Sequence, residues 1–157
     1  MTAAGYRLGP FALIDLIGAD INLAATEGMH RAMGGHPRYL PFDALKDQVA
    51  SGNLGRKTGR GFVFPEPPVS APSDAGAIAL RIEATLANEA LWLLSEGGTT
   101  PEGIDTAMRL GLNFPRGPFE DLSLHGRDAI AAELARLRTA APETLKPRYD
   151  PAPGLEA

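Results

Sequence analysis

Residues 9–20 read GPFALIDLIGAD, and a similar stretch returns 108 residues later, where residues 117–128 read GPFEDLSLHGRD. The opening Gly-Pro-Phe, one leucine, one glycine and the closing aspartate occupy the same places in both. In each copy the proline stands where it favours the first turn of a helix, and the glycine stands where it can end that helix. Pro-Arg-Tyr at residues 37–39 also returns, with a slip of two residues, at 147–149. This ordered repetition indicates a duplicated helical unit.

Helical spacing and helix-end signals extend from these two stretches over most of the chain. The strongest prediction is a helix over residues 77–96, where one stripe is formed by Ile78, Ile82, Leu86, Ala90 and Leu93. Thr100-Pro101-Glu102 combines an N-cap, a first-turn proline and a first-turn acid, so a helix is expected from Thr100 to Leu110, closed by Gly111. Shorter helices are expected at residues 10–17, 20–32, 41–50 and 118–125, and around Ile130, Leu134 and Leu137. The tail from Pro142 is expected to be mostly irregular, and the fold class is all-α.

These elements predict two tandem copies of a short-helix unit joined by a linker. The first copy covers residues 1–64 and is truncated at its N-terminal side, because the signature is reached after only a few residues. Residues 65–76 form the linker, since four prolines fall within eight residues and proline cannot donate the amide hydrogen bond of a helix interior. Such a segment is semi-rigid. The second, more degenerate copy covers residues 77–157.

The composition limits what the chain can do. Its net charge of −4 gives no basic surface of the kind that nucleic acid requires, and no apolar run approaches the length of a membrane-spanning helix. The sequence has no cysteine, which excludes disulfides, thiolate nucleophiles and cysteine-held metal sites. A basic start followed by an apolar stretch is also lacking, so no secretory signal is expected. We therefore expect neither nucleic acid nor membrane as a partner, and a cytoplasmic location.

The repeated residues carry a family resemblance. Residues 6–20, YRLGPFALIDLIGAD, resemble the central signature of the C-terminal helical domain of 3-hydroxyacyl-CoA dehydrogenases. Residues 54–62, LGRKTGRGF, resemble the segment that closes that domain, and residues 89–119 of the second copy follow the same order in a more degenerate form. Tandem copies of this kind resemble the dehydrogenases of phenylacetate and related acyl-CoA degradation.

The resemblance implies an oxidoreductase whose chemistry lies in another domain. In that family a Rossmann domain binds NAD and supplies the catalytic histidine with its acidic partner, while the helical domain helps to wall the acyl-CoA cleft and forms the dimer interface. No Gly-x-Gly-x-x-Gly follows a predicted strand here, so we assign no catalytic and no cofactor-binding residue, and NAD is expected only in the intact family enzyme. The family's substrate-contacting asparagine also lacks a counterpart, because Leu80 takes that place in the second copy.

We therefore predict the dimerisation and substrate-cleft portion of an NAD-dependent 3-hydroxyacyl-CoA dehydrogenase, inert alone. A homodimer is expected, because a helical unit without its Rossmann domain leaves apolar surface to cover. A separate NAD-binding domain is a further candidate partner. The alternative is a non-catalytic protein that binds acyl-CoA or acts as a scaffold. An independent enzyme has little support in the sequence.

The candidate substrate-binding residues are Lys57 and Arg60. Together with Arg56 and the glycines beside them, they could hold a phosphate of CoA through cations and backbone amides. The alternative is a glycine-permitted turn that joins a helix to an extended piece. We favour the turn, because no helix N-terminus follows.

The other polar candidates are interpreted as structural. His30, His36 and His125 lack the spacing of a metal site and are expected at the surface or at helix ends, so no metal ligand is assigned. Asp15 is replaced by Ser123 in the second copy, which indicates a local hydrogen-bonding group rather than a general base.

Four further residues are expected to contribute to packing. Glu89 lies near the apolar stripe of its helix, and we expect it to pair with an arginine. Phe11, Phe119 and Trp92 are expected in the core, because aromatic side chains bury large areas.

Overall fold

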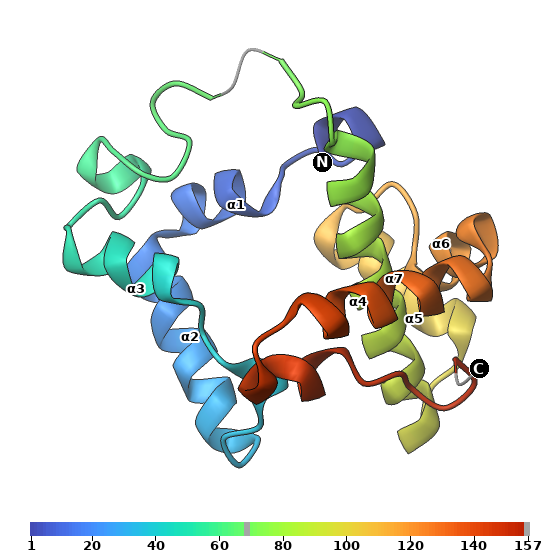
Figure 1. Ribbon diagram of the computed structural model, residues 1–157. Coiled ribbons are helices and arrows are strands. Elements are labelled where there is room, and N and C mark those ends of the chain that lie inside the picture. Colours follow the sequence, from blue (N-terminus) through green and yellow to red (C-terminus); the bar gives the residue numbers. More distant parts are fainter. Residues whose placement is uncertain (68–69, 156–157) are drawn as a thin grey trace. The chain divides into compact units, whose positions relative to one another are not determined.

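The computed structural model describes residues 1–67 and 70–155, and it confirms the all-α fold class (Figure 1). Among these residues no strand forms, and the one strand-like feature is an isolated bridge between Gly55 and Arg60. The chain divides into two compact units, each with a hydrophobic core. We call Leu8–Ala71 the small unit, and Met1–Arg7 together with Pro72–Ala157 the large unit.

The small unit contains the helices of the first repeat. Its elements are α1 (Pro10–Ile17), α2 (Ala19–Ala32), η2 (Pro37–Tyr39), α3 (Asp43–Ala50) and η3 (Arg56–Thr58), where η marks a 3-10 helix. Helix α1 has the predicted bounds, because Pro10 starts it and Gly18, at φ 111°, turns the chain directly into α2. The core is built on three buried residues: Ile14, Ala19 and Leu45.

The large unit contains the second repeat. Its elements are η1 (Thr2–Ala4), α4 (Ala75–Glu96), α5 (Pro101–Leu112), α6 (Pro118–His125), α7 (Arg127–Ala140) and η4 (Glu143–Tyr149). Helix α4 packs against both α6 and α7, which follow it in the same unit. The buried core joins these three helices through Ala84, Ala87, Leu91, Leu122, Ile130 and Leu134.

Helix α4 forms as predicted, but only part of the apolar stripe that was expected to be its buried face is buried. Ile78 and Leu93 are exposed, whereas the buried apolar residues of the helix are Ala79, Ala84, Ala87, Ala90 and Leu91. The distance between packed helices depends on the side chains at their contact, and alanines allow α4 to approach two neighbours at once. The face of α4 that packs against α6 and α7 is therefore the one that carries these small residues.

The end of α5 differs slightly from the prediction. Thr100 caps the helix as expected, because its hydroxyl oxygen accepts the N–H of Gly103 at 3.1 Å. The helix runs past Gly111 to Leu112, and Asn113 takes the left-handed conformation at φ 55° that closes it. Asparagine is the residue other than glycine that most readily adopts this conformation.

The prediction of a mostly irregular tail is only partly right. Residues 143–149 form η4, and Ala152 and Leu155 beyond it are buried in the core of the large unit. Asn88 of α4 fastens this segment, because its amide donates to the carbonyl oxygen of Asp150 at 3.0 Å and accepts the N–H of Ala152 at 2.7 Å. These partners lie more than sixty residues apart in sequence, so local patterns could not indicate the contact.

Two segments near the copy boundaries need separate description. Residues 1–7 belong to the large unit, where Tyr6 is buried and meets Phe114 edge to face, with ring centroids 5.1 Å apart. The predicted linker at residues 65–76 includes residues 68–69, which lie outside the described residues. Its last two residues already belong to α4, because that helix begins at Ala75.

The aromatic predictions hold only in part. Phe119 and Trp92 pack against the core of the large unit. Phe11 is 45% exposed and stacks on Phe62, with ring centroids 4.7 Å apart. Phe11 is therefore a boundary residue and not a core residue.

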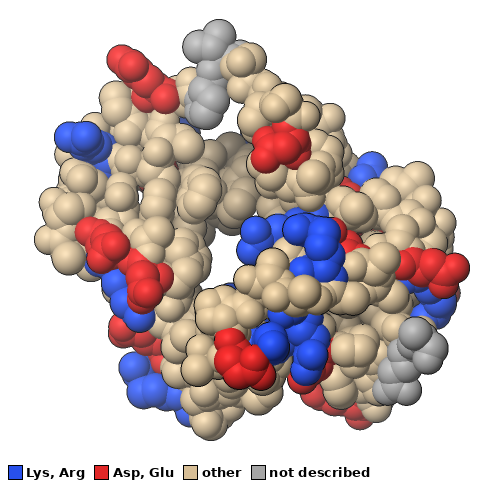
Figure 2. Space-filling view, viewed as in Figure 1, with Lys and Arg blue, Asp and Glu red and all other residues tan. Residues whose placement is uncertain are grey.

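On the side displayed in Figure 2, the surface has no extended patch of a single charge. Lys and Arg side chains lie there in small groups between Asp and Glu side chains, and uncharged residues cover much of the remainder. Within the described part of the chain, none of the helices combines the length and the apolar character needed to cross a membrane.

Candidate functional site

Asp15 organises the glycine-rich segment that follows η3. Its carboxylate is buried and accepts three backbone N–H groups, from Phe62 at 2.8 Å, Val63 at 2.8 Å and Phe64 at 2.9 Å. A Cβ at Gly61 would overlap this carboxylate, which explains the glycine there. Asp15 is thus a hydrogen-bonding group as predicted, but its partners are not local, because they lie 47 to 49 residues further along the chain.

Lys57 and Arg60 lie on the turn that Asp15 holds in place. The N–H of Gly55 donates to the carbonyl oxygen of Arg60 at 2.7 Å and closes the turn, which is the alternative that we favoured. Both basic side chains are exposed, and the Lys57 ammonium contacts the Asp20 carboxylate at 2.5 and 2.7 Å. The hydrogen bond from Lys57 lowers the pKa of Asp20. A CoA phosphate would have to compete with Asp20 for Lys57, so the binding role stays a prediction.

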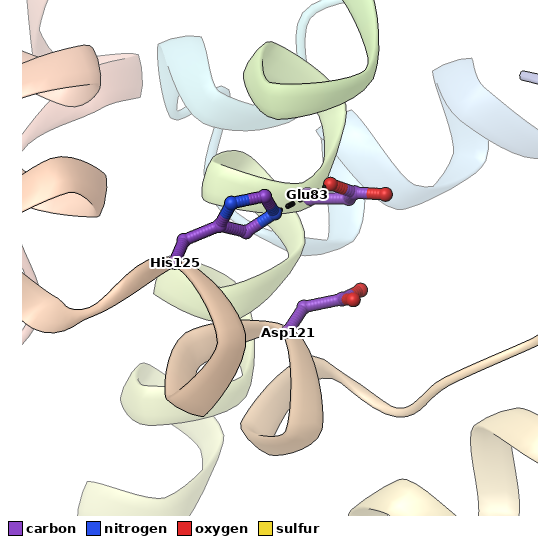
Figure 3. A group of neighbouring side chains, drawn as sticks. All are labelled: Glu83, Asp121 and His125. Carbon is purple, nitrogen blue, oxygen red and sulfur yellow. Dashed lines mark hydrogen bonds and ion pairs between the residues drawn. The ribbon is translucent and has the colours of Figure 1, made fainter. Parts of the chain in front are cut away.

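A second group of polar residues, buried in the large unit, was not predicted as a group. Glu83 from α4 lies beside Asp121 and His125 from α6 (Figure 3). The His125 Nε2 is 2.7 Å from a Glu83 oxygen, and the Arg116 guanidinium contacts Asp121 at 2.5 Å and Glu83 at 3.3 Å. The Tyr6 hydroxyl donates to Asp121 at 3.4 Å. We call these five residues the Glu83 cluster.

The Glu83 cluster holds two carboxylates that are each only 2% exposed. Burial raises the pKa of Asp121, although the hydrogen bond from Arg116 opposes this effect. The same hydrogen bond raises the pKa of Arg116, and burial raises the pKa of Tyr6, assisted by the nearby carboxylates. With one guanidinium for two carboxylates, the cluster is neutral when His125 carries a proton.

The geometry of the Glu83 cluster fits an ion-pair network better than a metal centre. Glu83, Asp121 and His125 each offer a ligand atom, and these atoms lie within 4.8 Å of one another. However, Arg116 already contacts both carboxylates, and a metal ion would place a second cation against its guanidinium. The large unit also has a shallow hollow next to α5 and α6, but Glu83 and His125 do not line it. The cluster therefore serves to fix α4 on α6.

The sequence signals for this cluster were weak. The spacing of Asp121 and His125 places them on one face of α6, four residues apart, and this could have been noticed. His125 was expected at the surface or at a helix end; it does end α6, but its side chain is 25% exposed and paired with Glu83. The acid of α4 that contacts Arg116 is Glu83, and the pairing of Glu89 with an arginine stays a prediction.

The sequence model of the 3-hydroxyacyl-CoA dehydrogenase C-terminal domain matches residues 1–64 and 76–156, which are the two copies of the repeat. The chain belongs to this family. It is 39% identical over 59 residues to the mitochondrial hydroxyacyl-coenzyme A dehydrogenase of Sus scrofa, a match that covers 38% of this chain and 19% of that protein. It is 26% identical over 175 residues to the fatty acid oxidation complex subunit alpha of Shewanella amazonensis, covering 98% of this chain and 24% of that protein.

The fold is also similar to that of a solved 3-hydroxyacyl-CoA dehydrogenase relative. The crystal structure of 3-hydroxybutyryl-CoA dehydrogenase from Escherichia coli K12 matches with a TM-score of 0.78 and 24% identity, over 97% of this chain and 51% of that one. At this identity the likeness concerns the fold alone. This chain thus spans about half of that structure and a smaller share of the two relatives above.

The described residues of this 3-hydroxyacyl-CoA dehydrogenase C-terminal domain do not fit NAD. Dinucleotides bind where a parallel strand turns into a helix through a glycine-rich loop. No strand forms in residues 1–67 or 70–155, and the glycine-rich turn at residues 55–61 precedes an extended segment without a helix. No catalytic step through NAD can therefore be assigned to these residues.

Proposed function

We propose that this chain is the dimerisation and substrate-cleft portion of an NAD-dependent 3-hydroxyacyl-CoA dehydrogenase. The reaction would convert a 3-hydroxyacyl-CoA to a 3-oxoacyl-CoA in fatty or aromatic acyl-CoA degradation, such as that of phenylacetate, in the cytoplasm. The observation that carries this proposal is the match of both repeats to the family's C-terminal domain. Because its described residues lack a dinucleotide-binding unit, the chain is expected to be inert alone.

Association is supported by the apolar side chains that the surface carries. Leu110 is 82% exposed and Leu124 is 62% exposed, and both lie in the large unit. Exposed apolar side chains favour association, since covering them removes apolar area from water. The proposal includes a homodimer, and a monomeric mass in sedimentation equilibrium at micromolar concentration would contradict it.

The CoA contact rests on the exposed positions of Lys57 and Arg60 beside one turn. Phosphate groups of CoA carry charge that either cation can neutralise. Lys57→Ala with Arg60→Ala should weaken acetoacetyl-CoA binding in calorimetry. Lys46→Ala is the matched control, because Lys46 also pairs with an aspartate in the small unit, at 2.9 Å from Asp43. Equal loss in both variants would contradict a specific contact.

The activity itself is tested by NADH oxidation with acetoacetyl-CoA. The purified chain is expected to show no turnover, and turnover should appear when the NAD-binding domain of a relative is added as a separate protein. Turnover by the chain alone would contradict the proposal. Acyl-CoA binding with no turnover in the mixture would instead favour the alternative, a non-catalytic acyl-CoA-binding or scaffold protein.

A further inference from the structure

The turn of residues 55–61 is fixed on the start of α2. The N–H of Ala19, the first residue of α2, donates to the carbonyl oxygen of Leu54, the residue before the turn, at 3.1 Å. A Cβ at Gly55 would overlap the backbone of Asp15 in α1, so the turn lies directly against that helix. A side chain on this turn therefore keeps a defined place beside the first turn of α2.

Lys57 uses that place to hold an acid of the protein itself. Its ammonium lies 2.5 and 2.7 Å from the two carboxylate oxygens of Asp20, in the first turn of α2. The pair lies on Gly18, where a Cβ would come within 2.9 Å of the Asp20 carboxylate and 3.1 Å of the Lys57 ammonium. The Lys57 side chain is 42% exposed and that of Asp20 is 40% exposed, so a dissolved anion can reach the ammonium.

Breaking this ion pair costs the fold little. Pairs that are this exposed contribute little to stability, because water screens the charges and holding two side chains together costs entropy. The turn keeps its other contacts, which join Leu54 to Ala19 and the Asp15 carboxylate to residues 62–64. The Lys57 ammonium can therefore exchange its anion while the turn persists.

The turn carries more positive charge than Asp20 balances. The Arg60 side chain is exposed and has no acidic partner within residues 1–67 and 70–155. The Arg56 guanidinium lies over the ring of Phe64, 5.9 Å from its centroid, and this cation–π contact leaves its charge uncompensated. Three cations therefore meet one carboxylate on this turn, and a further anion is electrostatically favourable there.

We propose that Asp20 sets the affinity of this turn for phosphate by acting as an internal competitor for Lys57. The inference rests on the proposed CoA contact of Lys57 and Arg60, and it adds the residue that limits the contact. While Asp20 offers both of its oxygens to the ammonium, a ligand meets only the arginines. Full binding requires the ligand to displace the Asp20 carboxylate.

The competitor also determines which phosphate of CoA can bind. An anion that displaces a carboxylate from an ammonium needs more charge than the carboxylate has. A phosphate monoester carries about −1.5 to −2 at pH 7, whereas each phosphate of a pyrophosphate diester carries about −1. The 3′-phosphate of CoA is a monoester, so it is the group that the turn accepts.

The variant Asp20→Asn tests the competition, because it removes the charge of the side chain and keeps its shape. In calorimetry with the full chain, its affinity for CoA should rise about fivefold, the equivalent of one exposed ion pair. Asp43→Asn is the matched control, since Asp43 pairs with Lys46 at 2.9 Å in the same unit and the net charge changes equally. It should change the affinity less than about twofold. Equal gains in both variants would overturn the proposal.

A double-mutant cycle separates competition from a structural role of Asp20. In the presence of Lys57→Ala, Asp20→Asn should change CoA affinity less than about twofold, because the group that Asp20 competes for is gone. The same gain with and without Lys57 would contradict competition. A loss of affinity in Asp20→Asn would also contradict it, since Asp20 would then hold Lys57 in its binding position. Circular dichroism checks that each variant is folded.

Dephospho-CoA, which lacks only the 3′-phosphate, identifies the bound group. The unchanged chain should bind CoA at least about tenfold more tightly than dephospho-CoA. Equal affinities, or no saturable CoA binding by either the unchanged chain or Asp20→Asn, would overturn the inference. The proposed enzymatic function is tested separately, by turnover in the mixture with an added NAD-binding domain. Turnover without any effect of Asp20→Asn on CoA affinity would remove this inference alone, and the expected affinities without turnover would remove the enzymatic role alone.

Discussion

The replacement Arg116→Met would remove the only guanidinium from the Glu83 cluster. Arg116 contacts Asp121 at 2.5 Å and Glu83 at 3.3 Å, and both carboxylates are 2% exposed. Methionine keeps most of the length of the side chain, so the change removes charge and hydrogen bonds more than volume. Glu83 would then keep only the imidazole of His125, and Asp121 would keep only the Tyr6 hydroxyl.

The structure sets the expected magnitude. Removing one partner of a fully buried ion pair costs about 3–5 kcal/mol. The Arg116 side chain is 34% exposed, so solvent already screens part of this interaction, and we expect a loss of about 2 kcal/mol from the free energy of unfolding at neutral pH. The loss should shrink as the pH falls, because burial raises the pKa of Asp121 and a protonated carboxyl no longer needs the guanidinium.

The single tryptophan makes this measurement specific to the large unit. Trp92 packs against that unit's core, so its fluorescence follows unfolding in urea at about pH 7 and about pH 4.5. Arg138→Met is the control, because Arg138 pairs with Asp150 at 2.9 Å and both side chains are about half exposed, so its loss should change stability little. A stability of Arg116→Met equal to that of the unchanged chain, or a loss that does not shrink at low pH, would refute the ion-pair interpretation.

Three further outcomes are expected. Asp15→Ala leaves three backbone N–H groups without their acceptor and should destabilise the small unit by about 3 kcal/mol, measured as early loss of helical circular dichroism in urea. Gly117→Ala places a Cβ against the buried Asp105 and should cost about 2 kcal/mol, whereas Gly111→Ala, with open space around it, should be neutral or stabilising. The pKa of Tyr6 is raised in the folded chain, so its contribution to stability is complete below its ordinary value of 10.0 and is lost as the pH rises above it. Tyr6→Phe should therefore lose less stability than the unchanged chain between about pH 9 and pH 11.

Local chemistry determined much of the fold before any tertiary contact is considered. Proline at the first turn and glycine after the last turn fixed the bounds of α1, and Thr100 capped α5 as expected. The 108-residue repeat indicated both copies, and the family match covers both. These signals depend on a few neighbouring residues, and backbone conformation at helix ends is a local property.

The contacts that define the candidate sites needed the tertiary structure. Asn88 of α4 hydrogen-bonds to the C-terminal segment, which was predicted to be irregular. Glu83 of α4 contacts Arg116, which precedes α6, and His125, which ends α6. Asp15 of α1 accepts N–H groups from residues nearly fifty positions further along the chain. The sequence indicated a local role for Asp15 but not its partners. A buried charge is tolerated only where its partners converge, and that convergence depends on how whole helices pack. The same packing explains why equivalent positions can be ionic and buried in one copy, as at Asp121, and apolar and exposed in the other, as at Leu13.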